Sequence, residues 1–418
     1  MRPVLAALAL STALCAPAFA TTPDEVAKTY ADIALASYED SLTTARALQV
    51  AVAALIASPS EETHLAAKAA WLAARIPYQQ TEVFRFGNAV VDDWEGRVNS
   101  WPLDEGLIDY VAEGYGQNEE NAFSGLNVIA TPAFTLSGTE IDASVITPDL
   151  ISGTLHEADG IEANVASGYH AIEFLLWGQD LNGTGPGAGA RAFTDYAMGD
   201  ACTNGNCDRR AAYLQAASDL LVTDLAEMTT AWAEGGAGRA AVTDDPLAGV
   251  LAMLTGMGSL SYGELGGERM KLGLMLNDPE EEHDCFSDNT HNSHFYDGLG
   301  IRNVYLGSYT RVDGSTVEGP SLSDLVAAAD PGIDSQLQAE LDASVAALGA
   351  VKAAAEGGLA YDQMLAPGNA EGETLIMGAV TALVTQTASI DRAVTALGLS
   401  KIGFEGSDSL DNPGAVFQ

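Results

Sequence analysis

The sequence predicts an all-α protein of two four-helix-bundle-like halves, packed side by side and connected by irregular loops. The chain has 418 residues and is 47% hydrophobic, which supplies enough apolar surface for a large core. Long segments rich in Ala and Leu begin and end at helix-capping residues, whereas alternating β-branched runs are scarce. Each half of the chain holds about four such segments, which suits a pair of bundles.

The first two helices are expected close to the amino terminus. One is expected over Asp24–Ala57. The next is expected to begin with Ser58 as its N-cap, because Glu61 then takes the reciprocal position of a capping box. It should run towards Phe86 with a kink at Pro77, which lacks a backbone N–H.

The middle of the chain alternates irregular and helical segments. Asp92–Ser137 is rich in Gly, Asn, Pro and aromatic residues and is expected to be irregular. A helical region opens at Thr147, where Pro and Asp follow, and continues to Trp177. The Gly-rich segment Gly178–Ala190 predicts a flexible loop, and a helix is expected after it over Asp208–Ala233.

The second half of the chain begins after a Gly-rich boundary at Gly235–Asp245. We therefore expect an N-terminal bundle over residues 21–237 and a C-terminal bundle over residues 238–418. A helix, a polar stretch with histidines and two closing helical regions are expected in turn over Pro246–Leu276, Asn277–Gly300, Ser321–Glu356 and Gly372–Leu399.

Residues 1–20 are typical of a secretory signal peptide. A positive residue precedes a short apolar stretch, and an A-x-A cleavage site ends at Ala20. The apolar stretch is too short to cross a bilayer, so we expect a periplasmic or other extracytoplasmic protein with no transmembrane span. Membrane association stays open. In an oxidising compartment Cys202 and Cys207 are expected to form a disulfide, which leaves Cys285 over.

The charge balance excludes one large class of partners. The chain has 58 acidic and 18 basic residues, and its formal net charge is -40. A field of this sign repels nucleic acid and concentrates cations. Adaptation of the surface to solubility or salt explains the charge as well as a cation-handling role does.

The segment GYHAIEFLLWGQD holds the first candidate for chemistry. His170 and Glu173 are three residues apart, so they share one face of a helix and offer a half-site for iron or zinc. A structural His–Glu pair between helices is the alternative. The zinc-peptidase motif H-E-x-x-H is absent, and the inverted form would need a histidine at Phe174.

Polar residues also recur at helical spacing along the second predicted helix. Arg75, Tyr78, Glu82 and Arg85 form a stripe through an otherwise apolar segment, which either binds a ligand or makes structural ion pairs. Asp104 lies among aromatic residues in irregular chain, where functional groups often occur.

A third candidate is the histidine-rich stretch of the second half. His283, His291 and His294 are three of the six histidines in the chain. A surface metal site and a polar loop that caps neighbouring helices are both open here. Cys285 makes redox chemistry a further alternative.

Several ordered blocks resemble one known family. GYHAIEFLLWGQD contains the G-x-H-x-x-E signature of the imelysin-like family, also called the insulin-cleaving membrane protease family. Further blocks resemble its iron-regulated protein A branch, and they keep their order over roughly Trp71 to Gly307: RIPYQQTEVFRFG, EGRVNSWPLDEGLIDY, GGERM and HDCFSDNTH…GIRNVYLG.

This resemblance implies an extracytoplasmic, all-helical protein with a metal site. His170 and Glu173 match the signature pair. Glu82 and Asp104 lie in blocks whose counterparts in related iron-uptake lipoproteins supply further carboxylate ligands. One turn after Glu82, this chain has Arg85 in place of a carboxylate, and its guanidinium would repel a cation unless it pairs with Glu82 or Glu173. Arg75 is likewise expected to form an ion pair or to lie behind the ligands.

The sequence therefore predicts an exported, iron-regulated, imelysin-like protein that binds iron or another divalent cation. The resemblance implies a part in iron acquisition, with iron-uptake components of the periplasm or outer membrane as partners. One alternative is a metal-dependent peptidase that uses Glu173 as ligand or base and a metal-bound water as nucleophile. The other is a module that binds a periplasmic partner without a metal.

Overall fold

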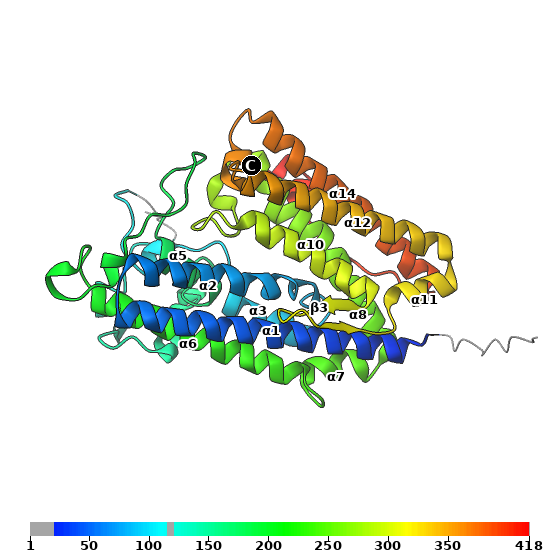
Figure 1. Cartoon of the computed structure of the whole chain (residues 1–418), viewed down its shortest axis with the longest axis horizontal. Helices are drawn as coiled ribbons and strands as arrows, with labels where there is room; N and C mark the ends of the chain where they lie inside the picture. Colours follow the sequence, from blue (N-terminus) through cyan, green and yellow to red (C-terminus); the bar gives the residue numbers. More distant parts are fainter. Residues whose placement is uncertain (1–20, 115–120, 418) are drawn as a thin grey trace, which may run out of the picture.

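The computed structural model describes residues 21–114 and 121–417 (Figure 1). The chain is 65% helical and 4% strand, so the prediction of an all-α protein is confirmed. The signal peptide expected over residues 1–20 lies outside the described residues.

The first group of helices is built around the long helix α1. A capping box at Thr22 starts α1, because the Thr22 side chain accepts from the Glu25 amide while the Glu25 carboxylate accepts from the Thr22 amide. Helix α1 packs against α2 and α6, and α5 packs against the same two helices (Figure 1). These four helices span Pro23–Ala57 (α1), Glu61–Gln79 (α2), Gly168–Trp177 (α5) and Cys207–Trp232 (α6).

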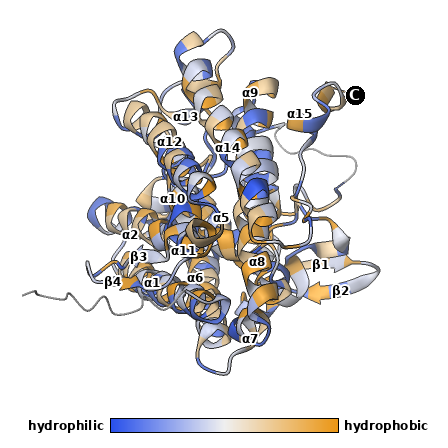
Figure 2. Cartoon of the chain, turned by 90° about the vertical axis from the view of Figure 1, so that its right-hand side faces the viewer, coloured by the Kyte–Doolittle hydropathy of each residue, from blue (hydrophilic) through white to orange (hydrophobic). Residues whose placement is uncertain are grey.

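The second group lies beside the first (Figures 1 and 2). Helix α12 packs against α10 and α14, and α14 packs against α8 and the π-helical segment η7 that follows α8 without a break. The group consists of Pro246–Ser259 (α8), Leu260–Leu272 (η7), Thr290–Leu306 (α10), Pro331–Glu356 (α12) and Ala370–Ala396 (α14). Because α8 also contacts α1 and α10 also contacts α2, one continuous apolar core runs through both groups.

Shorter elements fill the connections. The helices among them are Ala89–Asn99 (α3), Pro148–Leu150 (α4), Ala237–Thr243 (α7), Gly273–Leu276 (α9), Leu322–Ala329 (α11), Tyr361–Leu365 (α13) and Asp408–Asp411 (α15). Single turns are Glu82–Phe84 (η1), Glu105–Leu107 (η2), Ile151–Leu155 (η3), Ala158–Gly160 (η4), Phe193–Tyr196 (η5), Gly199–Ala201 (η6), Pro279–Glu281 (η8) and Ala415–Phe417 (η9). Two antiparallel hairpins pair Ala133–Leu136 (β1) with Thr139–Asp142 (β2), and Ser308–Thr310 (β3) with Thr316–Glu318 (β4).

The predicted ends of the second helix were wrong. Ser60, and not Ser58, is the N-cap of α2, and its partner in the capping box is Thr63. Ser58 already ends α1, since its amide donates to the Ala54 carbonyl, so the turn needs two further residues before a new helix starts. Helix α2 ends at Gln79, shortly after Pro77, because proline withdraws a backbone donor from its last turn.

Two other segments differ from the expected pattern. The region expected to be irregular begins inside α3, a helix that starts where the Asn88 side chain accepts from the Val90 amide. The helix expected from Thr147 to Trp177 is interrupted after Leu155. Glu157 and the residues near it adopt left-handed backbone conformations, which a right-handed helix does not accommodate.

The expected division between halves stays a prediction. Helix α7 begins at Ala237 and packs against α1 and α6, and the second group of helices begins with α8. Cys202 and Cys207 form a disulfide at the start of α6, and Cys285 is a free, half-buried thiol. Within the described part of the chain, no helix is both long enough and apolar enough to cross a membrane.

Candidate metal centre

Helix α5 carries the G-x-H-x-x-E motif through the middle of the protein, and all ten of its residues are buried. Its first residue, Gly168, has φ +81°, and a Cβ there would overlap the Val98 carbonyl of α3. Only glycine combines this conformation with such a close approach. The motif glycine therefore lets α5 press against α3 and fixes where His170 and Glu173 lie.

His283 and Asp284 come from the other group of helices, on the segment between η8 and α10. The start of α10 holds this segment, because the Asp284 amide donates to Thr290 Oγ1 at 3.0 Å. The Asp284 Oδ2 atom accepts from Asn289 Nδ2 at 2.8 Å and from Ser293 Oγ at 2.5 Å. These contacts aim the other carboxylate oxygen of Asp284 towards α2 and α5.

Three of these residues form a compact group of donor atoms. One ligand atom from each of His170, His283 and Asp284 lies within 4.8 Å of the other two. Their exposed fractions are 1%, 1% and 0%. Nε2 of His170 and both ring nitrogens of His283 have no hydrogen-bond partner. Buried imidazole nitrogens normally have partners, so this group, which we call the triad, has the character of a ligand site.

Glu173 contacts His170 but is not one of the three triad residues. Its Oε2 lies 3.1 Å from His170 Nδ1, while its Oε1 accepts from the amide and the hydroxyl of Ser287 at 3.0 and 2.6 Å. A carboxylate that accepts from Nδ1–H leaves the lone pair of Nε2 for an ion. Glu173 therefore orients the histidine.

A buried arginine provides the charge opposite Asp284. Arg75 donates to Asp284 Oδ1 at 2.8 Å and to Asn99 Oδ1 at 2.7 Å. The expected pairing of Arg75 with an acidic neighbour thus involves Asp284. Its guanidinium also lies over the ring of Tyr169, 5.0 Å from the centroid.

The protonation states of the three triad residues favour binding of a metal ion. Burial, followed by the Arg75 charge, lowers the pKa of His170 to about 3, and burial also lowers the pKa of His283 well below its usual value. Burial alone would raise the pKa of Asp284, but the charge of Arg75 and the hydrogen bonds from Ser293 and Asn289 lower it. Two neutral imidazoles and one carboxylate are the donor set of many zinc and non-haem iron sites.

Comparison with known proteins places the chain in a family. Residues 34–390 match the family model described as imelysin, peptidase M75. The chain belongs to the imelysin family. Iron-regulated protein A from Synechococcus elongatus is 31% identical over 90 residues, which are 21% of this chain. That match spans only 25% of the length of the relative.

Two solved structures have the same fold as this imelysin-family chain. A Parabacteroides distasonis protein assigned as an iron-regulated protein A precursor superposes with a TM-score of 0.64 at 20% identity, covering 91% of this chain and 97% of that one. An imelysin-like protein from Psychrobacter arcticum gives 0.58 at 14% identity, covering 93% and 100%.

Two residues expected near the metal lie elsewhere. Glu82, on η1, is buried and accepts from Arg269 Nη2 at 2.7 Å. Asp104 precedes η2, where its carboxylate accepts from the Asn121 side chain and its amide donates to the Ala163 carbonyl at 2.8 Å. Neither carboxylate belongs to the triad.

The remaining basic residue of the stripe is accounted for by ion pairs. Arg85 lies 2.9 Å from Asp92 and 3.7 Å from both Glu95 and Glu264. The expected pairing of Arg85 with Glu82 or Glu173 was therefore wrong, because these nearer carboxylates take its guanidinium.

The three histidines of the second half separate in the fold. His283 joins the triad, whereas His291 and His294 lie on α10 outside it. His294 is fully buried with its ring 5.0 Å from that of Tyr361, and His291 Nε2 lies 3.0 Å from the Asn292 side chain.

Asp284 and Arg269 are the residues that sequence reasoning missed. Asp284 directly follows His283 inside a block that resembles the family, which was an available signal. Arg269 lies in the block GGERM, on η7, and contacts Glu82, Glu264 and Asp297 at 2.7, 2.7 and 3.2 Å. Two of these partners, Glu82 and Asp297, lie far from Arg269 in the chain, and no local pattern reveals such pairing.

Proposed function

We propose that this protein binds iron or another divalent transition-metal ion through His170, His283 and Asp284, with Glu173 orienting His170. The observation that carries the proposal is the buried triad, with ring nitrogens that have no partner. A bound ion would use those lone pairs together with the second lone pair of Asp284 Oδ1, which already accepts from Arg75. Imidazole and carboxylate ligands favour iron or zinc over calcium or magnesium.

The biological role proposed is iron acquisition outside the cytoplasm. The name of the Synechococcus relative and the resemblance of the ordered blocks support this role. The amino-terminal segment supports export, and partners among iron-uptake components of the periplasm or outer membrane follow from the same role.

The contacts of Glu173 favour ion binding over peptide hydrolysis. A metallopeptidase needs a carboxylate that faces substrate and accepts a proton from a metal-bound water. Both Glu173 oxygens are engaged, one by His170 and one by Ser287, and the residue is 0% exposed. Incubating metal-loaded protein with insulin chains or casein tests the alternative, and cleavage lost in His170→Ala would support it.

The binding proposal is tested by metal titration of chelator-stripped protein. His170→Ala, His283→Ala and Asp284→Asn are compared with the wild type by calorimetry with Zn²⁺ and, without oxygen, Fe²⁺. His294→Ala is the matched control, because His294 is an equally buried histidine with unpartnered nitrogens outside the triad.

We expect about one equivalent of tightly bound ion in the wild type and in the control. Each triad variant should lose that binding while keeping a folded circular-dichroism spectrum. Equal stoichiometry and affinity in all five proteins would refute the site. Elemental analysis of protein purified without affinity metals then identifies the ion.

A further inference from the structure

The triad is buried, yet one of its members also lines an open pocket. His283 belongs to the wall of a pocket of about 510 Å³ between the two groups of helices. On one side its ring contacts Trp101, another wall residue, with 5.7 Å between ring centroids. On the other side it contacts His170, with 4.7 Å between centroids. His283 therefore connects the pocket to the triad, and both of its ring nitrogens are unpartnered.

The pocket wall is strongly acidic, and arginines compensate part of that charge. Asp92 and Glu95 pair with Arg85, while Glu264 pairs with Arg269. Four further carboxylates in the wall form no ion pair with a described lysine or arginine, and we call them the outer carboxylates: Glu157, Glu162, Glu268 and Glu281.

The outer carboxylates differ in their exposure to solvent. Glu157 and Glu162 are exposed, and Glu268 and Glu281 are half-buried. Glu268 and Glu281 line the same pocket as His283, so a cation in the pocket would meet both carboxylates on its way to the imidazole.

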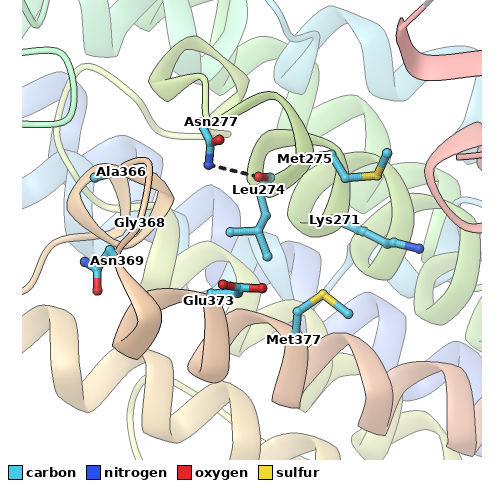
Figure 3. Close-up of a pocket in the computed structure, with 9 residues that line it drawn as sticks. All are labelled: Lys271, Leu274, Met275, Asn277, Ala366, Gly368, Asn369, Glu373 and Met377. Atoms are coloured by element: carbon cyan, nitrogen blue, oxygen red, sulfur yellow. Dashed lines mark hydrogen bonds between the residues drawn. The ribbon is translucent and has the colours of Figure 1, made fainter. Parts of the chain in front are cut away.

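A second pocket of the same protein has far fewer carboxylates in its wall. A pocket of about 380 Å³ between η7, α9 and α14 is lined by one lysine and one glutamate, with methionine and amide side chains around them (Figure 3). Asn277 there donates to the Leu274 carbonyl, and no histidine is in the wall. The 510 Å³ pocket combines carboxylates with a buried imidazole.

We propose that this pocket is the vestibule through which a hydrated divalent cation reaches the triad, and that the outer carboxylates attract it. The inference rests on the proposed function of the triad. An ion with six waters occupies roughly 200 Å³ at about 30 Å³ per water, so it fits a 510 Å³ pocket. At the inner end, a ring nitrogen of His283 replaces one water of the ion, and that water returns to the pocket.

The test separates the vestibule from the general negative field of the chain. One variant replaces the four outer carboxylates by glutamine. A control removes the same number of charges from exposed residues that do not line the pocket: Glu62→Gln, Glu234→Gln, Asp244→Asn and Glu318→Gln. Chelator-stripped full-length proteins are mixed with Co²⁺ in a stopped-flow instrument, and the cobalt absorption reports loading.

We expect the loading rate of the vestibule variant to fall about tenfold and to depend less on salt, since steering of ions by charged clefts is worth about ten- to a thousandfold. Its final amplitude should equal that of the wild type, because the triad is intact. The control should load within about twofold of the wild-type rate.

Equal loading rates in the vestibule variant and the control would overturn this inference and leave the metal site standing. A wild type that takes up no Co²⁺, Zn²⁺ or Fe²⁺ would overturn the proposed function and the vestibule with it. A lower amplitude with an unchanged rate would also contradict the vestibule, because it would make the outer carboxylates ligands rather than guides.

Discussion

Replacing Arg75 by methionine removes the only guanidinium that the described structure pairs with Asp284. The two side chains are 1% and 0% exposed, and their nitrogen and oxygen are 2.8 Å apart. At an effective dielectric constant of about 20 their gross attraction is about 6 kcal/mol, and desolvation of both groups offsets much of it. Breaking the pair leaves a buried charge, so we expect Arg75→Met to lower the free energy of unfolding by about 3–5 kcal/mol.

A double-mutant cycle isolates the interaction itself. Asp284→Asn should also destabilise the protein, because Arg75 is then the uncompensated charge. The double variant buries neither charge, so its loss should be smaller than the sum of the single losses by about 2 kcal/mol or more. The control cycle uses Arg302 and Asp342, a pair 2.7 Å apart whose side chains are 34% and 62% exposed, with an expected coupling below about 1 kcal/mol.

The assay is urea unfolding followed by far-ultraviolet circular dichroism in the presence of chelator. Additive losses at the buried pair, within about 0.5 kcal/mol, would refute the reasoning. Equal coupling in the two cycles would do the same. With Zn²⁺ in place of chelator, the ion supplies the positive charge that Arg75→Met removes, so its stabilising effect should be larger for this variant than for the wild type.

Three further changes test residues around the triad. Burial lowers the pKa of His294 to about 3, so the stability it contributes is complete above the unfolded pKa near 6.5 and is lost as pH falls. Relative to His294→Phe, the wild type should lose up to about 1.4 kcal/mol per pH unit below about pH 6 in urea unfolding, and parallel curves would contradict this. Gly168→Ala should cost about 3 kcal/mol or more in the same assay, because its Cβ would overlap the Val98 carbonyl, and an unchanged midpoint would exclude that overlap. Ser287→Ala removes a 2.6 Å hydrogen bond to Glu173, so calorimetry should show about tenfold weaker Zn²⁺ binding, whereas unchanged affinity would argue against an orienting role.

The long helices and the contact between His170 and Glu173 were predictable from local sequence. Capping residues and apolar periodicity depend on neighbours within a few positions, so the long helices were expected close to where they lie. His170 and Glu173 are on one helical turn, and their contact through Nδ1 and Oε2 follows from that spacing. The disulfide between Cys202 and Cys207 likewise joins residues close in the chain.

The composition of the metal centre was decided only by the tertiary structure. His170 lies on α5 in the first group of helices, and Asp284 lies just before α10 in the second group. The two residues come together only because both groups pack around one core. Glu82 is a buried carboxylate, as a metal ligand would be. It forms an ion pair at 2.7 Å with Arg269, which lies far along the chain. A buried carboxylate is stabilised by whichever cation packing brings to it, and the sequence alone does not tell whether that cation is a guanidinium or a metal ion.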